Sequence, residues 1–241
     1  MPVVLENLGK RFGDGAPVLD DVNANIKQGE FVALLGASGC GKSTLLNIIA
    51  GLEAPTSGAL EVPSDGAAFM FQDAALFPWL TARENIELAL KLRGAGKTER
   101  RTKAQELLEL VHLGSAGDKR PHELSGGMRQ RVSLARSLAQ DRQLLLMDEP
   151  FAALDAITRD LLHDELERIW KETGRTIVFV THNVREAVRL GQRVLLLSSR
   201  PGRVVQEWSV TEEHRTDAGL AGQLTGVITA RLREEIRRHA K

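Results

Sequence analysis

One short segment constrains the fold of this chain more than any other. An apolar run, Phe31–Leu35, leads directly into the glycine-rich stretch GASGCGKST at residues 36–44, and helical spacing of apolar residues begins at once afterwards. The stretch has the form G-x-x-x-x-G-K-[ST] of a phosphate-binding loop, in the strand-loop-helix setting that such a loop requires. The segment therefore predicts an α/β protein with this loop at the end of a central strand.

The loop at residues 36–44 has the chemistry of a nucleotide-phosphate site. Glycines allow consecutive backbone N–H groups to approach phosphate oxygens, and the start of the following helix adds partial positive charge. We expect Lys42 to reach the β- and γ-phosphates and the Ser43 hydroxyl to bind Mg²⁺. The residues predicted to bind ATP in this loop are Gly36, Ala37, Ser38, Gly39, Cys40, Gly41, Lys42, Ser43 and Thr44.

Two other interpretations fit the loop less well. An ordinary glycine turn would not need the flanking strand and helix. The dinucleotide-binding pattern G-x-G-x-x-G is not met, because the glycines fall at positions 36, 39 and 41, so a nicotinamide or flavin cofactor loses its main support. Cys40 lies inside the loop, but the chemistry of such a loop comes from backbone N–H groups, and we interpret the thiol as a bystander.

A pair of carboxylates forms a second candidate site. The apolar run 144–147 ends in Asp148 and Glu149, and the carboxyl end of a central strand lies on the rim where open α/β sheets bind ligands. Asp148 would hold Mg²⁺ through water, and Glu149 would act as the base that polarises an attacking water. Acidic residues also end strands as solvated caps, which is the structural alternative.

Charge and hydrophobicity exclude several classes of protein. The 32 Lys and Arg residues balance the 32 Asp and Glu residues, so no broad basic surface for nucleic acid is expected. The single cysteine cannot form an internal disulfide. Residues 1–10 do not resemble a signal peptide, and the longest apolar runs are far shorter than the roughly 20 residues that span a bilayer. We expect a soluble, intracellular chain.

Short β-rich runs alternate with helical patterns along the chain, which is typical of a parallel sheet covered by helices. Residues 81–140 form a helical block, a further apolar stripe at 157–170 ends at Gly174, and a charged helix is expected from about Gly219 to Lys241. The predicted strands are residues 3–8, 18–26, 31–35, 68–71, 144–147, 176–180 and 194–197.

The segment LSGGMRQR at residues 124–131 narrows the family. Ser125 can cap a helix there, and Gly126 and Gly127 expose backbone N–H groups, which makes a second anion-binding helix start. With this segment the sequence closely resembles the ATP-binding cassette (ABC) transporter ATPases, whose signature motif is LSGGQ and whose members form head-to-tail dimers. The resemblance covers residues 3 to about 205.

The resemblance implies the fold and its division. The expected fold class is α/β, a P-loop NTPase (RecA-like) core with an antiparallel β subdomain and a helical subdomain. It implies one ABC ATPase domain over residues 1–241, with the core at about 1–75 and 141–205, the helical subdomain at about 76–140, and a short C-terminal helical extension at 206–241.

The resemblance also assigns further site residues, with Glu149 as the catalytic base. Phe12 matches the aromatic residue that stacks on adenine, and Gln72 matches the Q-loop glutamine, which contacts Mg²⁺ or water and couples ATP to the membrane subunit. Asp155 matches the D-loop at the dimer interface, and His182 matches the switch histidine, which would contact the γ-phosphate. The signature residues Ser125, Gly126 and Gly127 would bind the ATP of the other subunit. The remaining histidines, interpreted as surface or core residues, are His112, His122, His163, His214 and His239.

Three positions depart from the family pattern. Asn183 follows the switch histidine where the family usually has aspartate, and Met128 replaces the glutamine of the signature motif. Neither position carries the charge chemistry. Residues 58–71 are fewer than the family usually has before the Q-loop, which suggests a trimmed hairpin.

An aromatic cluster follows the Q-loop, at Phe77, Pro78 and Trp79. These side chains could pack into the helical block or could form a groove that receives a short helix of another subunit. The resemblance favours the groove, since in ABC importers this surface receives the coupling helix of the membrane subunit. The cluster, with less specific features elsewhere, resembles the nitrate/sulfonate/taurine importer group.

That resemblance implies an ATPase at the cytoplasmic face of the cell membrane, peripheral to it, which uses ATP and Mg²⁺. The partners would be a second copy of the chain and transmembrane permease subunits, with an extracytoplasmic solute-binding protein acting indirectly, and no nucleic acid. The cargo would be a sulfonate, taurine or a nitrate-type anion. The alternatives are the motor of an ABC exporter, a non-transport ABC protein, and a generic P-loop kinase, against which the LSGG segment argues.

Overall fold

The computed structural model describes residues 2–239, and within them the larger of two β-sheets has six strands in the order β5-β6-β7-β3-β8-β9. Its strands run parallel except β9, which is antiparallel to β8. The phosphate loop follows the central strand β3, as the sequence predicted. The six strands are β3 (Phe31–Leu35), β5 (Ala67–Met70), β6 (Leu144–Asp148), β7 (Thr176–Val180), β8 (Arg193–Leu197) and β9 (Val204–Ser209).

The smaller sheet is antiparallel, in the order β2-β1-β4. Its strands are β1 (Val3–Lys10), β2 (Leu19–Ile26) and β4 (Ser57–Glu61). The trimmed hairpin expected at residues 58–71 is wrong, because β4 pairs with β1 while β5 pairs with β6 in the larger sheet. A turn closed by the Gly66 N–H and the Pro63 carbonyl oxygen separates them, and the chain passes there from one sheet to the other.

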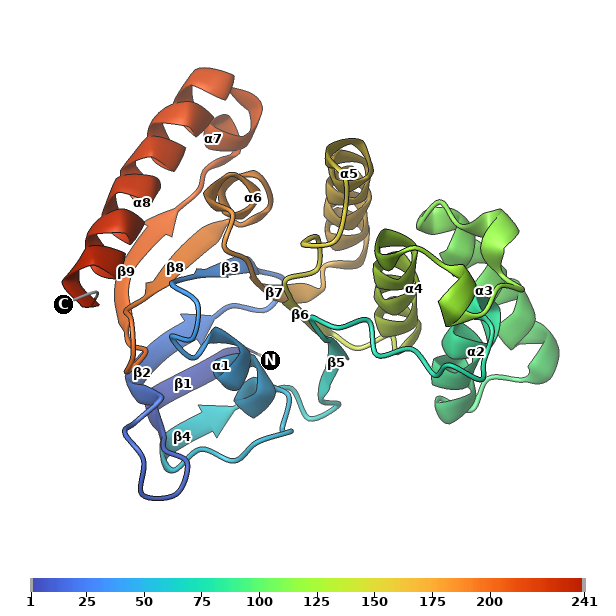
Figure 1. Cartoon of the computed structure of the whole chain (residues 1–241), viewed down its shortest axis with the longest axis horizontal. Helices are drawn as coiled ribbons and strands as arrows, with labels where there is room; N and C mark the ends of the chain where they lie inside the picture. Colours follow the sequence, from blue (N-terminus) through green and yellow to red (C-terminus); the bar gives the residue numbers. More distant parts are fainter. Residues whose placement is uncertain (1, 240–241) are drawn as a thin grey trace.

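Helices cover the larger sheet and extend from one side of it (Figure 1). The helices α2, α3 and α4 form a separate group beside the sheet. In the sequence they lie between β5 and β6, where a helical subdomain was predicted. Short 3₁₀ turns lie at Gly114–Ala116 and Pro121–Glu123. The helices are α1 (Lys42–Ile49), α2 (Ala82–Leu92), α3 (Lys97–Leu110), α4 (Gly126–Ala139), α5 (Ala156–Thr173), α6 (Val184–Leu190), α7 (Glu212–Thr216) and α8 (Ala218–His239).

The larger sheet is buried on both faces. Successive side chains of a strand point to opposite faces, so Val32 and Leu34 of β3 join one core, with the smaller sheet and α1. Phe31, Ala33 and Leu35 join a second core on the opposite face, with the helical group, α5 and α6. Burial on both faces is typical of parallel sheets and explains why β3 has no polar residue.

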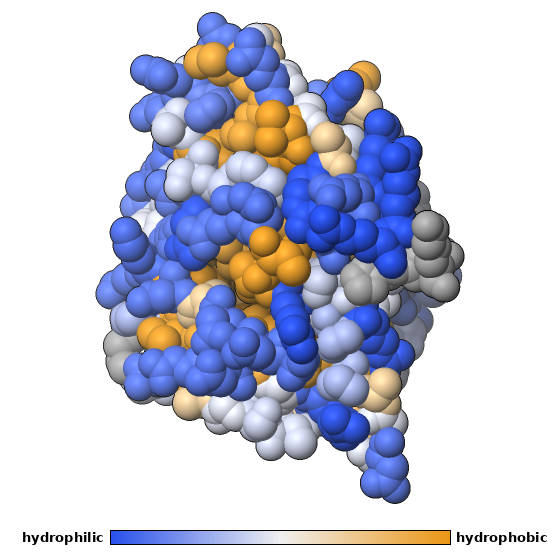
Figure 2. Space-filling model, turned by 90° about the vertical axis from the view of Figure 1, so that its left-hand side faces the viewer, coloured by the Kyte–Doolittle hydropathy of each residue, from blue (hydrophilic) through white to orange (hydrophobic). Residues whose placement is uncertain are grey.

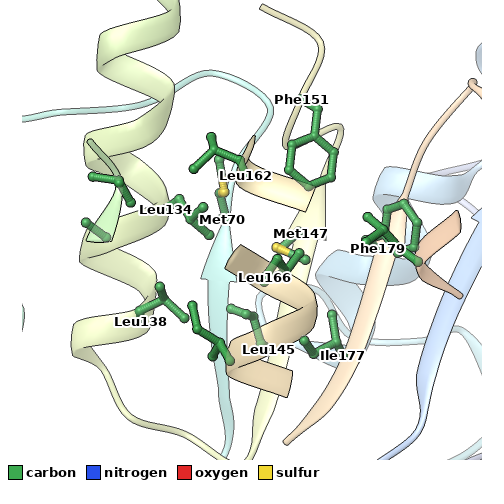
Figure 3. Close-up of a cluster of buried hydrophobic side chains, with 14 of the residues drawn as sticks. Met70, Leu134, Leu138, Leu145, Met147, Phe151, Leu162, Leu166, Ile177 and Phe179 are labelled. Carbon is green, nitrogen blue, oxygen red and sulfur yellow. The ribbon is translucent and has the colours of Figure 1, made fainter. Parts of the chain in front are cut away.

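The second core fixes the helical group to the sheet. Figure 3 shows Leu134 and Leu138 of α4 beside Met70 of β5, with Leu162 and Leu166 of α5 near them. Each such side chain contributes about 1.5–3 kcal/mol when it is fully buried. This packing sets the position of α4, whose first turn carries the signature motif.

The C-terminal helix α8 packs against α6 and α7, and Ile228 is its fully buried contact. The charged helix expected from Gly219 to Lys241 is observed from Ala218 to His239, and residues 240–241 lie outside the described part. Figure 2 views the side of the molecule on which α8 lies and shows hydrophobic patches separated by hydrophilic residues. Within the described residues, we find no helix with the length and hydrophobicity that a membrane span requires.

Candidate active site

The loop predicted to bind phosphates joins the end of β3 to the start of α1. Gly41 precedes α1 with φ of +105°, and a Cβ there would lie 2.6 Å from Leu19 Cδ2, so only glycine fits. The Lys42 side chain turns back into the loop and is 6% exposed. Its ammonium group donates to the carbonyl oxygens of Gly36 and Ala37, at 2.9 and 2.8 Å. Both acceptors are neutral carbonyl oxygens, so negatively charged phosphate oxygens could take their place as partners of the Lys42 ammonium group.

Other loop residues differ in exposure. Ser38, Gly39 and Ser43 are exposed, Thr44 is half-buried, and Cys40 is buried. Burial raises the pKa of the Cys40 thiol above its usual value, against the opposing charge of Lys42. A protonated thiol is a poor nucleophile, so this environment is consistent with a bystander role.

Asp148 lies at the end of β6, beside the phosphate loop. Burial raises the pKa of its carboxyl group, a hydrogen bond with the Ser43 side chain opposes that rise, and the Glu149 charge adds to it. Asp148 is 6% exposed, and its Oδ1 atom is buried without a hydrogen-bond partner. A buried carboxylate oxygen without a partner, next to a hydroxyl group, fits the oxygen ligands that Mg²⁺ prefers.

Glu149 and His182 meet at the same rim of the sheet. Glu149 Oε2 lies 3.3 Å from His182 Nδ1, and the Glu149 backbone N–H donates to the carbonyl oxygen of Val180 at 3.0 Å. Glu149 also has φ of +49°, a conformation that costs a non-glycine residue about 1–3 kcal/mol. The structure thus brings together the predicted base and the predicted switch histidine, and it turns Glu149 sharply off the end of the strand.

Phe12 lies outside this rim, in the turn between β1 and β2. Its ring is 49% exposed, and the Lys10 ammonium lies 4.7 Å from the ring centroid. Lys10 is itself held by Glu53 and by the Ala54 carbonyl oxygen, at 2.5 and 2.7 Å. An exposed aromatic face held against a fixed cation is suited to stacking with a flat base.

Known proteins match this chain over most of its length. The model of the ABC transporter family matches residues 19–152. The chain belongs to the ABC transporter family. It is 41% identical to the taurine import ATP-binding protein TauB of a Jannaschia species, over 97% of this chain and 92% of that protein. It is 46% identical to TauB of Mesorhizobium japonicum, over 90% of this chain and 88% of that protein.

Two further matches extend this result. The bicarbonate transport ATP-binding protein CmpC of Synechococcus elongatus is 50% identical over 83% of this chain, which spans only 32% of CmpC. Among solved structures, the dimeric ATP-binding cassette MJ0796, in a post-hydrolysis state bound to ADP and Pi, is similar with a TM-score of 0.79 and 38% identity, over 87% of this chain and 99% of that chain.

These matches confirm the predicted fold class and the predicted importer group, and the chain is an ABC importer ATPase that binds and hydrolyses ATP. The structure adds the placement of the motifs. The loop at 36–44, Asp148, Glu149 and His182 lie together at the carboxyl edge of neighbouring strands.

The ABC signature motif lies apart from this cluster. Ser125 caps α4 by accepting a hydrogen bond from the Met128 N–H at 3.2 Å, and Gly126 is exposed. A Cβ at Gly127 would lie 3.2 Å from the Ala153 carbonyl oxygen, so this first turn packs on the D-loop of the same chain.

Asp155 of the D-loop caps α5. Its carboxylate accepts hydrogen bonds from the Thr158 N–H and hydroxyl group, at 2.9 and 2.8 Å. These bonds lower the pKa of Asp155, which is exposed and free to meet a partner on its outer side. These two bonds attach Asp155 to the first turn of α5.

The Q-loop is attached to the signature helix. Gln72 is exposed directly after β5, and its carbonyl oxygen accepts a hydrogen bond from Gln130 of α4 at 3.4 Å. Arg136 of α4 donates to the carbonyl oxygens of Ala74 and Ala75, at 3.0 and 2.8 Å. Gln130 and Arg136 were not predicted from the sequence as contacts of the Q-loop. Their polar side chains on a helix with buried apolar residues were the only signal.

The aromatic cluster lies in the loop before α2. The rings of Phe77 and Trp79 lie 5.5 Å apart, and the two residues are 38% and 67% exposed. Pro78 between them is also exposed. The fully buried Asn85 holds the loop, since its Oδ1 accepts from the Phe77 N–H at 2.8 Å. The role of Asn85 in holding this loop was not predicted from the sequence. Its position next to the apolar Ile86 on a helix was the only indication of its burial.

Proposed function

We propose that two copies of this ABC ATPase bind two ATP molecules between them in a head-to-tail dimer. Each ATP would be bound by residues 36–44 of one copy and by the signature residues 125–127 of the other. The separation of these motifs within one chain supports the arrangement, because the signature turn packs on its own D-loop. The dimeric state of the similar cassette MJ0796 supports it as well.

Within each site, Lys42 would exchange its two carbonyl acceptors for the β- and γ-phosphate oxygens. Backbone N–H groups of the loop would bind the same phosphates, and Phe12 would stack on adenine. Mg²⁺ would be held by Ser43, by Gln72 and, through water, by Asp148. When bound, it would neutralise part of the phosphate charge. The unpartnered Asp148 oxygen is the feature that supports this donor set.

The observation that carries the catalytic proposal is the contact between Glu149 and His182 at the phosphate-loop rim. Glu149 would accept a proton from the attacking water. His182, which is exposed apart from this contact, would orient the γ-phosphate and the base. The positive φ of Glu149 marks a strained backbone at this position, which supports a functional role for the residue.

Replacing the proposed base provides the direct test. Glu149→Gln keeps the shape of the side chain but removes the proton acceptor, so kcat for ATP should fall by about 10²–10⁴-fold while ATP affinity remains. Steady-state hydrolysis and equilibrium binding of ATP would be measured on the same preparation. Near-normal turnover would reject Glu149 as the base. Glu167→Gln, a half-buried glutamate on α5, is the matched control and should leave kcat unchanged.

We further propose that the dimer docks on transmembrane permease subunits at the cytoplasmic face of the membrane. The exposed rings of Phe77 and Trp79 would receive a short helix of the permease. The cargo would be a small anion, a sulfonate such as taurine or a nitrate-type ion, delivered by an extracytoplasmic binding protein. Similarity to proteins named for taurine import supports the sulfonate class. Ligand binding by the binding protein of the same transport system would test the cargo.

A further inference from the structure

A buried carboxylate lies behind the switch histidine. Glu186, in the first turn of α6, is 7% exposed. Its Oε2 accepts a hydrogen bond from the Thr181 hydroxyl group at 2.6 Å, and its Oε1 accepts from Asn183 Nδ2 at 3.3 Å. The Asn183 N–H in turn donates to the Thr181 hydroxyl oxygen at 3.0 Å. Both neighbours of His182 are therefore attached to one carboxylate.

The same carboxylate is paired with an arginine that follows the D-loop. Arg159 Nε lies 3.4 Å from Glu186 Oε1, and Arg159 Nη2 donates to the carbonyl oxygen of Leu154 at 2.8 Å. Leu154 directly precedes Asp155. One arginine and one glutamate thus connect the D-loop backbone to both sides of His182.

We propose that Arg159 and Glu186 are positioning residues that couple the D-loop to the switch histidine. The proposal rests on the proposed role of His182 in hydrolysis. His182 itself is exposed, and among the described residues its side chain pairs only with Glu149, so its place over the nucleotide depends on how residues 181 and 183 are held. When a partner surface moves Asp155, Arg159 transmits the movement to the backbone beside His182.

The link between Arg159 and Glu186 reaches more groups than an ordinary surface ion pair does. A buried carboxylate requires compensation, and removing its partner leaves an uncompensated charge. Another arginine on the same surface, Arg189, is ion-paired within residues 2–239 only with the exposed carboxylate of Asp164. A purely stabilising pair on this surface would not need to bond both the D-loop backbone and the two residues that flank the switch.

Single and double variants of the link test the proposal by steady-state ATP hydrolysis. Glu186→Gln and Arg159→Met should each lower kcat by about 10-fold or more, since small misplacements of catalytic groups have such effects, and KM for ATP should change less than about twofold. The double variant should be no slower than the slower single variant, because both remove one link. Arg159→Lys should recover part of kcat. Arg189→Met is the matched control and should retain the kcat of the unmodified protein.

The outcomes separate this inference from the proposed function. Unchanged kcat in folded Glu186→Gln and Arg159→Met would overturn the inference, and so would an equal loss in Arg189→Met, which would indicate general loosening of α5 and α6. His182→Ala tests the underlying role: normal turnover there would reject the role of His182 itself. If the larger changes prevent folding, Glu186→Asp and Arg159→Lys provide the decision, and unchanged kcat in both would overturn the inference.

Discussion

At the scale of single residues, His163 is the side chain whose protonation the fold disturbs most clearly. Burial, together with the charges of Arg189 and Arg159, lowers its pKa from 6.5 to about 4, against the opposing charges of Asp160 and Asp164. The residue is 3% exposed, and both ring nitrogens lack a hydrogen-bond partner. The folded protein therefore holds a neutral imidazole at neutral pH.

This neutral histidine predicts a loss of stability in acid. Above pH 6.5 neither state is protonated at His163, whereas below it the unfolded chain binds a proton that the folded protein excludes until about pH 4. The free energy of unfolding should fall between these values. His163→Leu should make that fall shallower in urea titrations at several pH values. His122→Leu, at an exposed histidine, is the control and should keep the original slope.

The sequence identified residues whose role follows from a local motif, such as Lys42 and Asp148, and the structure places both at one rim. It did not reveal residues that act by contact across the chain. Glu186 contacts Thr181 nearby, but its link to Arg159 joins different helices, and no spacing along the sequence encodes that distance. His163 was interpreted only as a surface or core residue, and the structure shows the core.

At the scale of elements, the sequence predicted the described strands that bury apolar side chains and missed β4 and β9, in which no residue is buried. The missed strands β4 and β9 lie at sheet edges and are largely exposed, so they lack the hydrophobic signal of β3. β4 pairs with β1, which is distant in the sequence, whereas β9 pairs with β8, the strand directly before it. Pairing choice, which placed β4 beside β1 rather than in a hairpin with β5, depends on tertiary contacts that local patterns do not contain.

The loop that carries the aromatic cluster depends on one helix residue. Besides accepting from the Phe77 N–H, Asn85 donates through Nδ2 to the carbonyl oxygens of Leu80 and Thr81, at 3.3 and 2.9 Å. Asn85→Leu would remove these side-chain hydrogen bonds and leave the partly buried Phe77 N–H and Leu80 carbonyl oxygen unpaired, at up to about 1–3 kcal/mol for each group, while the Thr81 carbonyl keeps its bond from the residue 85 backbone N–H. We expect amide hydrogen exchange in residues 77–81 to accelerate by about 10-fold or more.

The control for this prediction lies on the same helix. Lys91 is exposed near the end of α2, and Lys91→Gln should leave exchange in residues 77–81 as it is in the unmodified protein. If Asn85→Leu exchanges at the original rate while the protein stays folded, the side chain of Asn85 does not hold the loop. The aromatic cluster would then be ordered by its own ring contact between Phe77 and Trp79.

At the scale of the whole molecule, the two motifs that we propose to bind one ATP lie in different parts of the fold. The phosphate loop follows β3, while the signature turn opens α4 in the helical subdomain and packs on the D-loop. In a dimer with a twofold axis, the phosphate loop of each copy would face the signature turn of the other copy. The sequence motifs predicted a dimer of this kind. The structure adds that the two motifs lie on different elements of the folded chain.

Mixing two inactive variants tests whether the site is shared between copies. Lys42→Ala removes the phosphate-binding cation, and Ser125→Arg places a bulky side chain at the signature turn; each alone should show almost no hydrolysis. In an equal mixture, random pairing makes half of the dimers mixed, each with one intact site of two, so about a quarter of the normal activity should return if the sites act independently. Activity that stays at the sum of the two variants would reject a site shared between subunits, and substantial turnover by Ser125→Arg alone would reject a role for the signature turn.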